Sequence, residues 1–134
     1  MTNVKKLKIA RTLFVIYVIC VLVLCLKHLK QLPDVPASFW GIPSDKWAHF
    51  LMFLPFPVLS RFSLDFEGAK YRKKFFSAFA ILAAGCAFAA LTEYLQGLTP
   101  YRQTEILDFT ADVIGMSLST IAVLIFDLIH RNEQ

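Results

Sequence analysis

A long apolar segment near the amino terminus limits what this chain can fold into. No charged residue occurs from Thr12 to Leu26, and a helix of about 20 apolar residues is long enough to cross the hydrocarbon core of a membrane. Of the 134 residues, 57% are apolar and only 18% are charged, and the mean hydropathy is +0.56. This composition is too apolar for a soluble domain of the same size. The sequence therefore predicts an integral membrane protein.

The apolar segments predict an all-α fold, a bundle of four transmembrane helices that forms a single domain over residues 1–134. The predicted spans cover about residues 9–29, 46–62, 75–96 and 104–129. Pro55 and Pro57 lie near the middle of the second span, where they must kink or unwind the helix. Neighbouring helices are then expected to donate hydrogen bonds to the freed carbonyl groups.

Two flanking segments fix the ends of the first two spans. The first span is interpreted as an uncleaved anchor, because Lys27, His28 and Lys30 follow it in place of a small-residue cleavage site. The linker over residues 31–43 is rich in proline and is not expected to form a regular helix. Ser44 or Asp45 is predicted to be the N-cap of the second span.

The positions of lysine and arginine predict the orientation in the membrane. Before the first span lie Lys5, Lys6, Lys8 and Arg11, and between the second and third spans lie Arg61, Lys70, Arg72, Lys73 and Lys74. The other two loops have fewer: Lys27, Lys30 and Lys46 between the first and second spans, and Arg102 between the third and fourth. Because cytoplasmic loops carry the excess of such residues, both termini and the middle loop are expected to be cytoplasmic. Topology thus explains the net charge of +4, and no nucleic-acid partner is predicted.

Polar side chains gather at the predicted outer ends of the second, third and fourth spans. They are Asp45, Lys46, His49, Glu93, Gln96, Arg102, Asp108 and Asp112. Ionisable groups in a membrane are costly unless they are paired or hydrated, so a functional site is the first hypothesis. Helical spacing places Asp45 with His49, and Asp108 with Asp112, on one face of each helix. The spacing therefore predicts a polar crevice between the three helices that opens outward.

Three interpretations of this crevice are open at the level of sequence. In the first, an enzyme acts on an anionic envelope precursor, with His49 as general base or nucleophile and Glu93 or Asp108 orienting it. The catalytic set is then His49, Glu93, Asp108 and Asp112, and the substrate-binding set is Lys46, Arg102, Asp45 and Gln96. In the second, the same residues hold a lipid or precursor without turnover. In the third, they form an ion-paired network that only ties the helices together.

Metal binding is a further alternative. One histidine and three carboxylates offer suitable ligands for a divalent cation. The sequence has no HExxH-type spacing, however, and Lys46 and Arg102 bring positive charge to the same region. No metal or other cofactor is therefore predicted. The cysteines Cys20, Cys25 and Cys86 are odd in number and lack ligand spacing, so neither disulfides nor a metal site are expected from them.

The ordered motifs resemble a known family. The residues Asp45-Lys46-x-x-His49-Phe50, Glu93-x-x-Gln96, and Arg102 followed by Asp108-x-x-x-Asp112-x-x-Gly115 resemble the VanZ-like family of small bacterial membrane proteins, and the match covers roughly residues 43–125. The family takes its name from a protein that accompanies glycopeptide-resistance genes and confers teicoplanin resistance. The chain departs from the family pattern at Asp112, where an asparagine is expected, and the added carboxylate favours a bound cation or a proton shared between carboxylates.

This resemblance implies a multi-pass protein of the bacterial inner membrane, with the polar site on the extracytoplasmic side. The partners that it implies are membrane lipid and an anionic, lipid-linked precursor of the cell wall. It does not specify a reaction, so the enzymatic and the non-catalytic interpretations both remain open at this stage.

Overall fold

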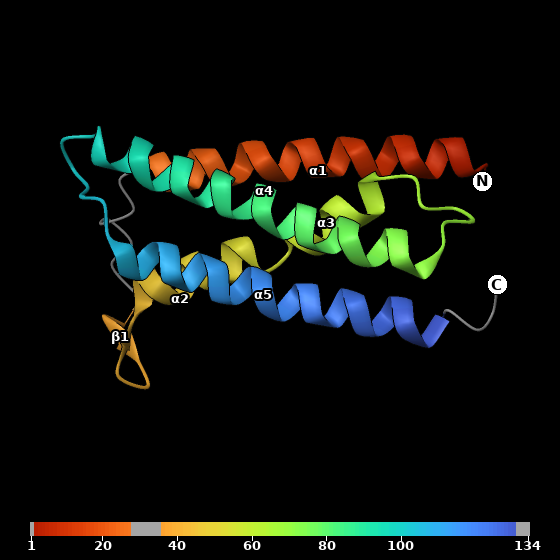
Figure 1. Ribbon diagram of the computed structural model, residues 1–134. Coiled ribbons are helices and arrows are strands. Elements are labelled where there is room, and N and C mark those ends of the chain that lie inside the picture. The colour runs from red at the N-terminus through yellow and green to blue at the C-terminus, as the bar shows by residue number, and fades with distance from the viewer. Residues whose placement is uncertain (1, 28–35, 131–134) are drawn as a thin grey trace.

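The computed structural model describes residues 2–27 and 36–130, and in these ranges the chain consists of helices and one small hairpin (Figure 1). In chain order the elements are α1 (Asn3–Leu26), β1 (Ser38–Phe39), β2 (Ile42–Pro43), α2 (Ser44–Phe53), α3 (Phe56–Ser63), α4 (Tyr71–Gly97) and α5 (Ile106–Ile129). The predicted helical membrane class is confirmed. The predictions that involve His28 and Lys30 lie outside the described residues.

Three of the described helices are long and apolar enough to cross a membrane. They are α1 with 24 residues, α4 with 27 and α5 with 24. The predicted second span is instead divided into α2 with 10 residues and α3 with 8, and each of these is too short to cross a bilayer alone. The three long helices make the chain a multi-pass membrane protein.

The break between α2 and α3 lies where the prolines predict it. Leu54 and Pro55 separate the two helices, because proline has no N–H to donate and its ring clashes with the preceding turn. The hydroxyl of Tyr17 on α1 donates to the carbonyl oxygen of Met52 at 2.5 Å. A neighbouring helix therefore satisfies a carbonyl group beside the break, as expected.

The linker contains a short hairpin that the sequence did not lead us to expect. β1 and β2 pair in antiparallel register, Ser38 with Pro43 and Phe39 with Ile42. Trp40 and Gly41 connect them with φ values of 51° and 76°. Positive φ at both central residues defines a type I′ turn, which matches the twist of paired strands. The pairing ends at Pro43, where α2 starts.

The predicted N-cap of α2 is wrong. Pro43 holds that position, and neither Ser44 nor Asp45 caps the helix, since α2 already begins at Ser44. The Ser44 hydroxyl donates instead to the carbonyl of Pro36, and its backbone N–H donates to Ala37 at 3.1 Å. These bonds tie the start of α2 to the linker, so the hydroxyl is occupied elsewhere.

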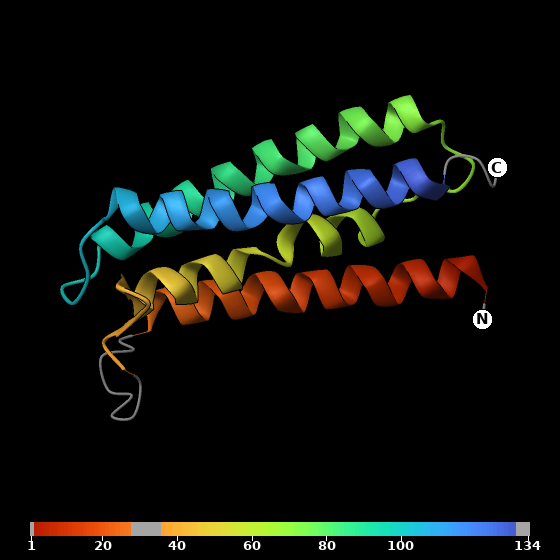
Figure 2. The same ribbon diagram turned by 90° about the horizontal axis from the view of Figure 1, so that it is seen from below.

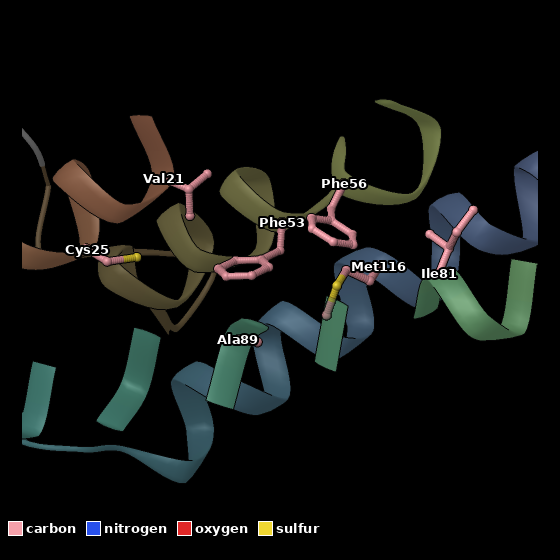
Figure 3. Packing of buried hydrophobic residues seen from close by; sticks show 7 residues of the cluster. All are labelled: Val21, Cys25, Phe53, Phe56, Ile81, Ala89 and Met116. Carbon is pink, nitrogen blue, oxygen red and sulfur yellow. The ribbon is translucent and has the colours of Figure 1, made fainter. Parts of the chain in front are cut away.

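The helices lie side by side along one common direction. In both views α2 and α3 follow one another along the length of the bundle, and the amino end of α1 lies at the same end as the carboxyl end of α5 (Figures 1 and 2). Figure 3 shows Phe53, Phe56 and Met116 together at the junction of α2, α3 and α5. The bundle is thus packed around the broken pair.

Gly115 allows α5 to approach α2 closely. A Cβ atom at this position would lie 2.6 Å from the carbonyl oxygen of Phe50. Only glycine fits such a backbone contact, and small residues serve this purpose widely in membrane helices. Phe50 directly follows His49, and Gly115 lies about one turn beyond Asp112, so the contact fixes the spacing of the helices beside the polar cluster.

Candidate functional site

His49 on α2 lies at the centre of a buried polar cluster. Its side chain is 1% exposed, and its Nδ1 lies 3.0 Å from Oδ1 of Asp112 on α5, which is fully buried. Oε1 of Glu93 on α4 lies 3.8 Å from the same nitrogen. On the other side of the ring, Nε2 lies 3.5 Å from Oδ2 of Asp108. Carboxylates from two helices therefore surround one imidazole.

A second polar group lies closer to the end of the bundle, and we call it the outer cluster: Lys46 with the three carboxylates of Asp45, Glu105 and Asp108. The Lys46 Nζ donates to Asp45 at 2.9 Å and also to Glu105 and Asp108. The positive charge of Lys46 therefore lies among the three carboxylates. The outer cluster thus contains its own cation.

The inner cluster, His49, Glu93 and Asp112, has hydrogen-bonding capacity left over. Oε2 of Glu93 accepts from the backbone N–H of Glu105 at 3.1 Å. Within the described residues, Glu93 Oε1, Asp112 Oδ2 and His49 Nε2 are buried without a hydrogen-bond partner. Buried polar atoms are normally satisfied, and each exception calls for an explanation.

Gln96 and Arg102 bind the end of α1. Their side chains donate to the carbonyl of Cys25 at 3.0 and 3.1 Å, respectively. The last carbonyls of a helix have no partner within the helix, so both residues act as caps for α1. Among residues 2–27 and 36–130 no carboxylate forms an ion pair with Arg102. Its charge is therefore not neutralised by a described acid.

The structure brings together the predicted catalytic set of His49, Glu93, Asp108 and Asp112, while the chemical roles of these residues remain predictions. The geometry adds one detail: the closest carboxylate to the His49 ring is Asp112, rather than Glu93 or Asp108. Of the predicted substrate-binding set, Lys46 and Asp45 belong to the outer cluster. Gln96 and Arg102 contact α1.

Two functional contacts were missed at the sequence level. Glu105 contributes a carboxylate to Lys46 and a backbone N–H to Glu93. Its spacing of three residues from Asp108 would have placed it on the same side of the helix start. No sequence pattern predicts that the Cys25 carbonyl accepts from Gln96 and Arg102, because it is a main-chain group on a helix far away in the chain.

An ion pair lies at the opposite end of the bundle. The guanidinium of Arg61 donates to both oxygens of Asp127, at 2.9 and 3.2 Å, and it lies 4.0 Å from the centre of the Phe66 ring. Asp127 thus pairs with a basic residue at the end of the second predicted span. This pair needs no functional explanation.

Comparisons with known proteins yield no matching family model, no similar curated protein and no similar solved structure. The VanZ-like resemblance therefore stays a prediction that rests on the ordered motifs, and the geometry of the two clusters carries the functional argument.

Proposed function

We propose that this chain is a membrane-embedded enzyme of the bacterial cell envelope that acts on an anionic, lipid-linked precursor, as a hydrolase or transferase. The observation that supports it best is a fully buried Asp112 at 3.0 Å from the Nδ1 atom of His49. A carboxylate that accepts from one imidazole nitrogen fixes the tautomer in which the other nitrogen takes a proton. A stabilised imidazolium is then available to return the proton to a leaving group.

The proposed topology has four crossings, with α2 and α3 together forming the second. Their succession along the bundle supports this assignment (Figure 1). The excess of lysine and arginine before α1 and between α3 and α4 favours cytoplasmic termini. With this orientation the outer cluster and His49 face the extracytoplasmic side of the inner membrane, where envelope precursors are processed.

The positive charge of Arg102 supports an anionic substrate. Arg102 is half-buried and has no described carboxylate partner, and a guanidinium binds phosphate or carboxylate through two parallel hydrogen bonds. The VanZ-like resemblance adds the context of the cell wall and glycopeptide resistance, and it suggests teicoplanin as the antibiotic for a phenotypic test.

The test is a lipid-conversion assay with a matched stability measurement. The purified chain is placed in liposomes that contain a bacterial envelope lipid extract, and the lipids are compared by mass spectrometry after incubation with wild type or His49→Gln. We expect wild type to convert an anionic lipid and His49→Gln to lose this conversion, because glutamine cannot shuttle a proton at neutral pH. Thermal unfolding in detergent checks that His49→Gln remains folded.

A folded His49→Gln protein that converts lipid as wild type does would rule out catalysis through this residue. The double variant with Glu93→Gln serves as a coupling test, since residues that act as one catalytic unit are strongly non-additive.

A second candidate function is a binding protein that modulates the precursor without turnover. The observation that favours it is the burial of His49, which is only 1% exposed, so a substrate reaches the ring only if the helices move. In the same assay this function predicts that an anionic lipid copurifies with the wild-type chain and stays chemically unchanged.

A further inference from the structure

We propose that the inner cluster, His49, Glu93 and Asp112, binds a divalent transition-metal cation such as Zn²⁺ or Mn²⁺. These residues come from α2, α4 and α5, and each offers one ligand atom within 4.8 Å of the other two. All three side chains are buried. The site would thus join three helices that are distant in sequence.

The distances suit a common metal ion. The Nδ1 atom of His49 lies 3.0 Å from Asp112 Oδ1 and 3.8 Å from Glu93 Oε1. Ligand atoms at about 2.0–2.2 Å from a Zn²⁺ ion lie roughly 3–3.6 Å from each other. The ligand atoms of Glu93 and Asp112 lie within 4.8 Å of each other, so the three side chains draw together when a cation binds between them.

Unused oxygen atoms provide a second, independent observation. Within the described residues, Glu93 Oε1 and Asp112 Oδ2 have no hydrogen-bond partner although both are buried. Isolated buried carboxylate oxygens are costly, and paired ions or metals usually accompany them. A cation bound by His49 Nδ1, Asp112 Oδ1 and Glu93 Oε1 supplies the missing partner of Glu93 Oε1 and compensates the charge of the Asp112 carboxylate.

Surrounding groups already hold the ligands in place. The backbone N–H of Glu105 fixes Oε2 of Glu93, which leaves Oε1 directed to the cluster. Oδ2 of Asp108 lies 3.5 Å from Nε2 of His49, and Lys46 holds the other oxygen of Asp108. Metal-binding histidines commonly donate their second N–H to a carboxylate, and Asp108 is the nearest carboxylate to Nε2, so Asp108 is assigned as a positioning residue that accepts from Nε2 when the cation is bound.

The position of the nearby cations distinguishes the two clusters. Lys46 contacts all three carboxylates of the outer cluster, so an ammonium group already lies where a metal ion would bind there, and Arg102 donates to the Cys25 carbonyl. In the sequence, the positive charges of Lys46 and Arg102 were the reason not to predict a metal ion. Neither has a described contact with Glu93 or Asp112, so two buried carboxylates share one imidazole.

The ligand set indicates the class of cation. Ca²⁺ and Mg²⁺ prefer ligand shells made of oxygen alone, whereas imidazole with carboxylates suits Zn²⁺ and similar transition metals. Three protein ligands also leave a coordination position open, as catalytic metal sites do. In the cation-bound state Nδ1 of His49 binds the cation and no longer donates to Asp112, so cation binding and the proton transfer of the proposed function are alternative states of this residue. Cation binding itself does not depend on the proposed reaction.

The experiment measures cation binding to the purified full-length chain in detergent without any substrate. The protein is stripped with EDTA, titrated with Co²⁺ while visible absorption is recorded, and then titrated with Zn²⁺ in competition. We expect one Co²⁺ per chain, displaced by Zn²⁺. Asp108→Asn should raise the Kd by about 10- to 100-fold, as loss of such a partner usually does, and Asp112→Asn or Glu93→Gln should raise it further.

Glu105→Gln is the matched control. It removes a nearby carboxylate but keeps the backbone N–H that holds Glu93, so its Kd for Co²⁺ should equal that of wild type. Circular dichroism reports whether each variant is folded. If Asp112→Asn does not fold, the proposal is tested by the Co²⁺ absorption spectrum of wild type and by the Kd of Asp108→Asn for Co²⁺.

A stripped wild-type chain that takes up no Co²⁺ or Zn²⁺ would overturn the proposal. So would equal affinity in wild type and in the folded Glu93 and Asp112 variants. Cation binding without any lipid conversion would instead leave the cation site intact and remove the proposed enzymatic function.

Discussion

Individual side chains determine how the buried charges of this membrane protein are compensated. At one end of the bundle, Arg61 and Asp127 satisfy each other through two hydrogen bonds. At the other end, Lys46 is bound by three carboxylates, while His49 faces more carboxylates than it can neutralise. A structural pair is complete by itself, whereas a binding site keeps unused capacity for a ligand. This difference separates the two ends of the molecule.

Removal of Arg61 should strongly destabilise the protein. The Asp127 side chain is only 4% exposed and Arg61 is 15% exposed, so Arg61→Gln leaves a buried carboxylate uncompensated, which costs about 3–5 kcal/mol. Thermal unfolding in detergent should show a lower Tm. Arg61→Gln combined with Asp127→Asn should recover much of this loss, because the second change removes the unpaired charge. A double variant less stable than Arg61→Gln would contradict this account.

At the scale of elements, the broken pair of α2 and α3 positions the site. Pro55 ends the first segment, and α2 is left as a short helix that carries Lys46 and His49 toward α5. The contact at Gly115 holds α5 against the backbone of α2. Glu93 lies near the carboxyl end of α4 and completes the site. The site therefore depends on close packing of helices more than on any single motif.

Gly115→Ala should test this dependence. The added Cβ would lie 2.6 Å from the Phe50 carbonyl oxygen, so α2 and α5 must move apart, at a cost of about 1–3 kcal/mol for overpacking. The Tm in detergent should fall. Leu118→Ala is the control, since Leu118 is 52% exposed on the same helix and its Tm should change little. Equal Tm values for Gly115→Ala and wild type would show that the contact is not tight.

At the scale of the whole molecule, the amino end of α1 and the carboxyl end of α5 share one end of the bundle, and α2, the helix that carries His49, lies toward the other (Figures 1 and 2). Such a bundle separates the basic residues near α1 and α4 from the acidic clusters. This asymmetry is what an orientation in the membrane requires.

Reporter fusions should reveal that orientation. A reporter after Gln134 is expected to be active in the cytoplasm, and a reporter in the loop near Thr99 is expected to be active outside, because basic residues concentrate on the cytoplasmic side. An alkaline phosphatase and a fluorescent-protein fusion at each position give opposite signals and serve as mutual controls. A cytoplasmic signal at Thr99 would place the site on the inner face and remove the envelope function.

The sequence by itself determined the helical membrane class, the break at Pro55 and the list of residues that meet at one end. Apolar length, proline chemistry and helical spacing are local properties, so the order of residues along the chain is enough to predict them. The tertiary structure decided which groups touch. Two contacts depend on how far each helix is rotated and shifted against its neighbours: which of Asp112 and Glu93 lies nearest to His49, and whether Arg102 donates to the Cys25 carbonyl. Those rotations follow from contacts such as that at Gly115, which join residues far apart in the sequence.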